Sequence, residues 1–189
     1  MTLFSDEITV AGLRLELLRP STPEALIDEE AFAVDEFLPY WAELWPAARA
    51  LAEALPGVEG LRVVELGCGL GLPSLVAAAK GASVTAIDWS PDAVALLRAN
   101  AVRNGLALRA VVRDWREPWH ERFDLVLAAD VLYEERNVDP VLERVCELAP
   151  DALVALAGRP YEGAFLRLAE ASGKRIEHIG KLVRLREER

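Results

Sequence analysis

The stretch Leu61-Arg-Val-Val-Glu-Leu-Gly-Cys-Gly-Leu-Gly-Leu-Pro-Ser74 decides the fold of this chain. Its apolar first part, residues 61–66, predicts a buried strand, and Pro73 predicts the first turn of a helix. A tight turn joins the two and contains Gly67, Gly69 and Gly71. Glycine allows positive φ angles and, because it has no Cβ, lets a ligand approach the backbone closely. The segment therefore predicts a strand, a ligand-binding loop and a helix.

The spacing of these glycines and the acid before them indicate the kind of ligand. The spacing is G-x-G-x-G, whereas a dinucleotide-binding loop reads G-x-G-x-x-G and places a pyrophosphate at the helix N-terminus. Glu65 ends the strand, and its carboxylate suits a cationic cofactor better than a pyrophosphate. S-adenosylmethionine carries a sulfonium and an ammonium group, so we expect this cofactor. A purely structural glycine turn is the alternative.

Length and composition predict a soluble cytoplasmic protein of one domain. The 189 residues match the usual domain size of about 100–200 residues, and we expect one domain over 1–189, with a hairpin and a covering segment inside 1–40. No apolar run approaches the roughly 20 residues of a membrane span. The N-terminus carries Asp6 and Glu7 where a secretory signal carries basic residues. Cys68 and Cys146 do not resemble a disulfide framework.

The charge of the chain indicates the class of its partners. Its 31 acidic residues outnumber the 21 lysines and arginines, which gives a formal net charge of −10. This balance disfavours nucleic acid, because binding to phosphates requires basic side chains, and it favours a basic protein as partner. His120 and His178 are too far apart in sequence to suggest a metal site, so no metal is expected.

The N-terminal part is expected to form a small hairpin and a covering segment. Apolar residues alternate over residues 7–18 around Gly12, which indicates a β-hairpin. The acidic residues 24–39 predict either a short helix and loop over the sheet or a solvated surface, with neither favoured. Trp45 then precedes a helix expected over 46–55, and it either anchors the packing there or lines the ligand site.

Strand and helix patterns alternate along the rest of the chain. Further strands are expected at 82–87, 106–112, 123–129, 152–157, 175–179 and 182–186, and further helices at 71–80, 91–104, 138–148 and 161–171. This alternation predicts an α/β fold, a Rossmann-like three-layer sandwich. Its seven-stranded sheet is expected to be mostly parallel, with an antiparallel last strand.

Acidic and aromatic residues follow the second and third of these strands. Asp88 ends the second strand, where a carboxylate can accept hydrogen bonds from both ribose hydroxyls of a nucleotide. The alternative role, N-cap of the next helix, can be filled by Ser90. Asp114 and Trp115 follow the third strand, and they suit an adenine, although Trp115 could be ordinary edge packing.

Asp130 and Tyr133 follow the fourth strand in the same way. Asp130 could instead be the N-cap of the helix after it. Ligands of parallel sheets bind at the carboxyl ends of the strands, so the residues at these ends are expected to converge on one site.

These residues resemble the seven-strand, class I methyltransferases that use S-adenosylmethionine. Segment 65–71 resembles their first motif, Asp88 their ribose-binding acid and Asp114 their adenine-binding acid. A narrower resemblance, over about residues 41–150, is to the seven-strand protein lysine methyltransferases and their nicotinamide N-methyltransferase-like relatives. Its motifs are Leu44-Trp-Pro-Ala47, Gly71-Leu-Pro-Ser74, Asp114-Trp115 and Ala129-Asp-Val-Leu-Tyr133, of which the last matches the family's D-x-x-Y element.

The resemblance implies a role for each of these residues. Contacts to S-adenosylmethionine, whose product is S-adenosylhomocysteine, are expected from Trp45, Glu65, Gly67, Cys68, Gly69, Asp88, Asp114, Trp115 and Ala129. Asp130 and Tyr133 are expected to be the catalytic residues at the acceptor site, Asp130 orienting the amine and Tyr133 lining its channel. Cys68 departs from the small Ala or Ser that is frequent in the family, yet it should fit sterically.

The function that these expectations favour is N-methylation of a lysine side chain in a protein. The same site would serve for N-methylation of a small molecule or of a protein N-terminus. A cofactor-binding assembly partner without catalysis is disfavoured by the intact Asp130 and Tyr133. A dehydrogenase is disfavoured by the spacing of the glycines.

Overall fold

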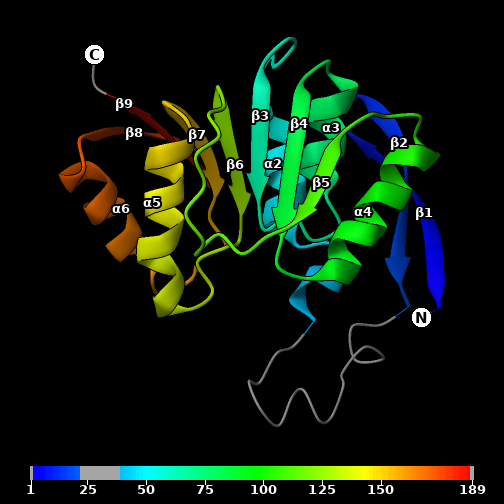
Figure 1. Ribbon diagram of the computed structural model, residues 1–189, viewed down its shortest axis with the longest axis horizontal. Coiled ribbons are helices and arrows are strands. Elements are labelled where there is room, and N and C mark those ends of the chain that lie inside the picture. Colours follow the sequence, from blue (N-terminus) through cyan, green and yellow to red (C-terminus); the bar gives the residue numbers. More distant parts are fainter. Residues whose placement is uncertain (1, 22–38, 188–189) are drawn as a thin grey trace, which may run out of the picture.

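The computed structural model describes residues 2–21 and 39–187. The covering segment expected at 24–39 lies outside the described residues, except for its last residue. Figure 1 shows a central sheet with helices on both faces and a separate hairpin from the N-terminal part. Within the described ranges, none of the helices has the length and apolarity needed to cross a membrane.

Seven strands form the central sheet in the order β5-β4-β3-β6-β7-β9-β8. Their bounds are β3 Arg62–Leu66, β4 Ser83–Asp88, β5 Arg109–Val112, β6 Leu125–Ala129, β7 Asp151–Ala155, β8 Lys174–Ile179 and β9 Leu182–Glu187. Strands β3 to β7 are parallel to one another, and β9 pairs antiparallel with both β7 and β8. The predicted sheet, mostly parallel with an antiparallel last strand, is confirmed.

Helices cover both faces of this sheet, as Figure 1 shows. Their bounds are α2 Pro46–Ala54, α3 Leu72–Ala79, α4 Pro91–Arg103, α5 Val138–Leu148 and α6 Glu162–Ala171. Helices α2, α3 and α4 share one apolar core with Val63 and Leu127, whereas α5 and α6 share the other with Val64 and Val126. Successive residues of a strand point to opposite faces, so β3 and β6 contribute to both cores. Strand β6 is wholly apolar, whereas β3 carries Arg62 at its start and Glu65 near its end.

Strand β5 is shorter than predicted, and the reason lies at the end of α4. The sequence predicts a strand over 106–112, but pairing with β4 begins only at Arg109. The backbone N–H of Leu106 still bonds to the carbonyl of Ala101 in α4, at 2.9 Å. Residues 106–108 are therefore used to leave the helix before the chain enters the sheet.

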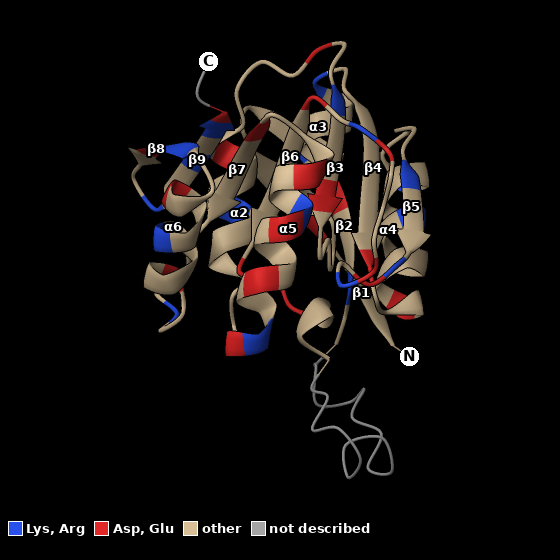
Figure 2. Cartoon of the chain, turned by 60° about the vertical axis from the view of Figure 1, so that its left-hand side comes forward, with Lys and Arg blue, Asp and Glu red and all other residues tan. Residues whose placement is uncertain are grey.

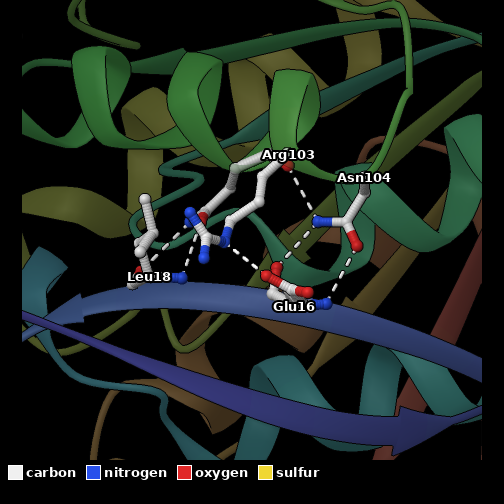
Figure 3. A network of polar contacts seen from close by, with 5 residues as sticks. Glu16, Leu18, Arg103 and Asn104 are labelled. Carbon is white, nitrogen blue, oxygen red and sulfur yellow. Dashed lines mark hydrogen bonds and ion pairs between the residues drawn. The ribbon is translucent and has the colours of Figure 1, made fainter.

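The predicted N-terminal hairpin is confirmed and consists of β1 (Leu3–Val10) and β2 (Leu13–Pro20). Two amide side chains, one in α4 and one at its C-cap, hold the second strand, as Figure 3 shows for the C-cap residue Asn104. Asn100 accepts from the N–H of Leu18 (2.7 Å) and donates to its carbonyl (3.1 Å), and Asn104 binds Glu16 in the same way (2.9 and 2.7 Å). Residues four apart on a helix and two apart on a strand have similar spacing, so the two amides match alternate residues of β2.

Replacing Asn100 by alanine is expected to destabilise the protein by about 2–3 kcal/mol, because the two partly buried backbone groups of Leu18 lose their partners. The Asn100 side chain is fully buried against β2. Urea unfolding measures the effect, and Val102→Ala on the same helix is the control, since Val102 is 79% exposed and should change stability by less than about 0.5 kcal/mol. An unchanged midpoint for Asn100→Ala would show that these amide bonds do not anchor the hairpin.

Candidate functional site

One cavity of about 190 Å³ opens at the carboxyl ends of the parallel strands, between the glycine loop and the segment before α2. The structure brings most of the residues singled out in the sequence to its wall. Those that line it are Trp45, Glu65, Gly67, Cys68, Gly69, Asp88, Trp115, Ala129, Asp130 and Tyr133. The strand ends therefore converge as the parallel-sheet rule predicts.

The glycine loop has the backbone conformation that glycine allows. Gly67 and Gly71 have φ angles of +63° and +77°. A Cβ on Gly67 would lie 2.6 Å from Cζ3 of Trp115, and one on Gly71 would lie 2.3 Å from Cδ1 of Leu97. The expectation of positive φ is confirmed, and the loop has an additional reason for glycine, because neighbouring side chains pack directly against its backbone.

Asp88 connects the glycine loop to the start of α4. Its Oδ2 accepts a hydrogen bond from the N–H of Gly69, and its Oδ1 accepts one from the N–H of Ser90, both at 2.9 Å. Ser90 is the N-cap of α4, since its Oγ accepts from the N–H of Ala93 at 3.3 Å. Burial raises the pKa of Asp88, which is 4% exposed. The N-cap role is therefore filled without Asp88, and its carboxylate faces the cavity beside the loop.

Glu65 is a buried carboxyl group that lines the same cavity. It accepts hydrogen bonds from the backbone N–H of Ser74, at 3.0 Å, and from the Ser74 hydroxyl. Burial raises its pKa to about 8, although the bonds from Ser74 oppose this shift and the charge of Asp88 adds to it. A positively charged ligand bound beside these two buried acids would stabilise their deprotonated, charged forms.

We expect the pH dependence of stability to report this burial of Glu65. The pKa is about 8 in the fold against an ordinary 4.5, so between these values the unfolded chain is deprotonated while the folded protein keeps the proton. The contribution of Glu65 to stability is therefore fully present below pH 4.5 and is lost as the pH rises through about 8.

Thermal unfolding of wild type and Glu65→Gln between pH 5 and pH 9 measures this contribution, because glutamine is isosteric and does not titrate. As the pH increases from 5 to 9, the Tm of the variant should rise by several degrees relative to that of wild type. Each kcal/mol of stability that wild type loses corresponds to about 2–4 °C. A constant difference in Tm across this range would mean that Glu65 keeps an ordinary pKa.

Asp130 forms an ion pair that the sequence did not predict. Its oxygens accept bonds from Nε and Nη2 of Arg159, each at 2.7 Å, and its side chain is only 5% exposed. Asp130 has a left-handed φ of +53°, and the N-cap of α5 is Asn137, so the alternative role of Asp130 as that N-cap was wrong. Arg159 follows β7, the neighbour of β6 in the sheet, so its place beyond a parallel strand end could have marked it as a site residue, although not as the partner of Asp130.

Aromatic rings border the cavity next to this ion pair. The ring of Tyr40 lies 5.5 Å from that of Tyr133 and 6.2 Å from that of Trp45, and the Arg159 guanidinium lies 5.7 Å from the Trp45 ring. The indole N–H of Trp45 donates to the Tyr40 carbonyl at 2.7 Å. Burial raises the pKa of Tyr133 to about 12, so its hydroxyl stays protonated at neutral pH. Tyr40, which sequence reasoning did not select, belongs to this wall.

Asp114 is the one predicted site residue that does not line the cavity. Its oxygens accept bonds from the backbone N–H of Arg116 (2.8 Å) and from Nε of the same residue (2.7 Å). It lines an adjoining hollow that shares Trp89, Trp115, Tyr133 and Glu134 with the cavity. Asp114 therefore lies next to the cavity rather than on its wall.

The charges around the cavity are unbalanced. Among its described lining residues, Arg159 is the one basic side chain. The acidic ones are Glu43, Asp88, Asp130, Glu134 and Glu65, of which Glu65 keeps its proton at neutral pH because its pKa is about 8. Such a cavity attracts cations and repels anions such as a pyrophosphate.

Comparisons with known proteins agree with this geometry. Residues 63–150 match a family model described as a methyltransferase domain. The electron transfer flavoprotein beta subunit lysine methyltransferase of Danio rerio is 38% identical over an alignment of 107 positions, and the match covers 53% of this chain and 42% of that protein. The protein N-terminal and lysine N-methyltransferase of Aspergillus fumigatus is 30% identical over an alignment of 169 positions, and this match covers 72% of this chain and 65% of that protein.

Solved structures share the fold. The magnesium protoporphyrin IX methyltransferase of Synechocystis PCC 6803, crystallised with bound S-adenosylmethionine, superposes with a TM-score of 0.67 and 16% identity, over 87% of this chain and 99% of that one. The chain spans about two thirds or less of the length of the two curated relatives above. Residues 63–150 thus match a methyltransferase-domain model, the chain shares its fold with solved methyltransferases, and the relatives it resembles include protein lysine methyltransferases.

Proposed function

We propose that this protein is an S-adenosylmethionine-dependent N-methyltransferase that modifies a lysine side chain of a protein. The observation that carries this proposal is that Asp130 and Tyr133 of the D-x-x-Y element line the same cavity as the glycine loop. The names of the two curated relatives, both lysine methyltransferases, support the acceptor class. The residues 1–189 are proposed to act as one domain, since the hairpin is bonded to α4 through Asn100.

The residues of the cavity fit a cationic cofactor. Asp88 and Glu65 supply buried carboxyl groups beside the bare backbone of the loop, and no basic side chain is paired with either in the described residues. We assign Asp88 to the ribose hydroxyls and Trp115 to the adenine, with Asp114 in the adjoining hollow. The remaining cofactor contacts are assigned to Gly67, Cys68, Gly69, Trp45 and Ala129. When bound, S-adenosylmethionine supplies an electrophilic methyl group.

The chain's own residues then hold the acceptor. Alignment of two reactants can supply about 7–11 kcal/mol of a reaction barrier, and the rings of Tyr40, Trp45 and Tyr133 with the Asp130 carboxylate can provide it. A lysine has an ordinary pKa of about 10.4 and arrives protonated, so the site must favour loss of its proton. The apolar rings disfavour the charged form by removing water. Tyr133 stays protonated, and it therefore lines the channel rather than acting as a base.

The charge of the surface supports a protein as the acceptor. The net charge is −10, and Figure 2 shows acidic residues along α5, where Asp139, Glu143 and Glu147 lie four residues apart. Such a surface repels nucleic acids and anionic membranes and attracts basic protein segments. A cytoplasmic location is proposed from the two unpaired cysteines, Cys68 and Cys146.

The same cavity would serve for N-methylation of a small molecule or of a protein N-terminus, and one experiment separates these outcomes. Purified protein, S-adenosylmethionine with a labelled methyl group and an extract of its source organism are incubated together. Label that enters a protein band and is recovered as methyl-lysine after acid hydrolysis supports the proposal. Label in the small-molecule fraction, or no transfer at all, would contradict it. A reaction without extract corrects for modification of the protein's own Lys80, Lys174 and Lys181.

A further inference from the structure

The ion pair between Asp130 and Arg159 joins the ends of two neighbouring strands. Asp130 follows β6 directly, and its backbone N–H still bonds to the carbonyl of Ala155 in β7, at 3.2 Å. The Arg159 guanidinium meets both carboxylate oxygens in the bidentate form, which is the strongest and most specific geometry for this pair. The two charges therefore neutralise each other on the wall of the cavity.

Several further contacts keep Arg159 in this position. Its guanidinium lies over the Trp45 ring, and the turn before it is fixed by the Glu162 carboxylate, which accepts from the N–H groups of Ala157 (2.7 Å) and Gly158 (2.9 Å). Asp130 for its part holds a left-handed backbone conformation, which costs a non-glycine residue about 1–3 kcal/mol and is found mainly at functional sites. The surrounding contacts therefore fix the positions of both Asp130 and Arg159.

We propose that Arg159 is a positioning residue that sets the charge of the acceptor site by neutralising Asp130, so that the site receives the amine in its neutral form. This inference rests on the proposed function. An isolated carboxylate next to the acceptor would stabilise the ammonium, which cannot attack a methyl group. A carboxylate already paired with a guanidinium still offers lone pairs to orient an N–H group, but it attracts the positive charge far less.

Other charged and titratable groups also face this pair. Tyr40 lies near Arg159, and Glu162 lies on α6 beside it. Around the rest of the cavity the groups are Glu43, Glu65, Cys68, Asp88, Tyr133 and Glu134. They are unchanged in the variants below, so differences between these variants report the Asp130–Arg159 pair.

The test uses sinefungin, a cofactor analogue that carries a C–NH₃⁺ group where S-adenosylmethionine carries its methylsulfonium, and S-adenosylhomocysteine, which has no charge there. The ratio of their affinities reports how the site treats a cation at the position of transfer, and it requires no acceptor. Calorimetry measures both affinities at pH 7 for wild type, Arg159→Met, Asp130→Asn and the double variant.

In the four proteins, the preference for sinefungin over S-adenosylhomocysteine should follow the net charge of the residues at positions 130 and 159. Relative to wild type, the preference for sinefungin should rise about tenfold in Arg159→Met, where a carboxylate is left, and fall about tenfold in Asp130→Asn, where a guanidinium is left. The double variant is neutral again and should return to within about threefold of wild type. The differences should shrink as the pH rises through the pKa of the analogue's amine. Single variants that shift in the same direction, or not at all, would overturn the proposal.

Two controls keep loss of structure apart from loss of charge. Arg184 forms the same bidentate pair with Asp151 (Nε to Oδ1 2.9 Å), away from the cavity lining, so Arg184→Met should leave the ratio unchanged. If Arg159→Met does not fold, two variants still test the proposal. The preference for sinefungin should fall in Asp130→Asn and return to near the wild-type value in the double variant. Wild type that binds neither ligand would refute the proposed function itself, whereas normal binding without opposite shifts would refute only the role of Arg159.

Discussion

Replacing Asp130 by alanine is expected to lower kcat/KM for methyl transfer by about a thousandfold, the middle of the range of about 10²–10⁴ for a positioned polar side chain in catalysis. The Kd for S-adenosylhomocysteine should stay within a few-fold of wild type. Asp130 lines the cavity beside Tyr133, and its backbone conformation directs it there at an energetic cost. We therefore expect it to contact the acceptor rather than the cofactor.

The structure explains why the loss should be large. Without the carboxylate, the Arg159 guanidinium loses both of its partner oxygens. The guanidinium has only N–H donors, so no oxygen is left at this position to orient the amine. This loss acts on transfer, whereas the carboxyl groups of Asp88 and Glu65 near the glycine loop are unchanged.

The matched control for this experiment is Asp151→Ala. Asp151 also accepts two hydrogen bonds from one guanidinium, that of Arg184. It lies at the start of β7, away from the cavity lining. Its loss should cost stability but leave kcat/KM within about twofold. Turnover of Asp130→Ala equal to that of Asp151→Ala would remove Asp130 from the mechanism. Single-turnover rates and Kd, measured on the same preparations, separate binding from transfer.

The parts of this site that follow from local pattern could be predicted from the sequence. The strand period and the glycines place Glu65, Gly67 and Gly69 at one strand end, and the next strand places Asp88 at its own end. Parallel strands then bring these ends to one edge without any knowledge of the strand order. For this reason the predicted residues meet in one cavity, although they are distant in the chain.

The parts that depend on strand order and side-chain direction could not be predicted. Arg159 lies in a loop without periodicity, and it meets Asp130 only because β7 is next to β6. Asp114 stands at a strand end as expected, yet it binds Arg116, two residues further on, and lines the adjoining hollow instead of the cavity. Neither fact is visible in hydrophobic pattern or motif spacing, which give the position of a residue but not the partner of its side chain.

Asp88→Ala is expected to weaken the binding of S-adenosylhomocysteine by about a hundredfold, since hydrogen bonds to a charged group contribute about 1.5–3 kcal/mol each and more than one is lost. In the proposed complex the carboxylate binds the ribose hydroxyls, and in the structure it also accepts from the N–H groups of Gly69 and Ser90. The substitution therefore removes a ligand contact and frees the backbone of the glycine loop.

Two further variants separate these two effects. Asp88→Asn keeps the size of the side chain and one carbonyl oxygen, which can still accept from Gly69, but it loses the charge and one acceptor. If the carboxylate binds the ribose, Asp88→Asn should lose much of the affinity while its Tm stays near wild type. Asp92→Ala removes an exposed acid from the same helix start and should bind normally. Calorimetry showing wild-type affinity for Asp88→Ala would refute the ribose assignment, because a carboxylate that is 4% exposed on this wall has no other proposed partner in the cofactor.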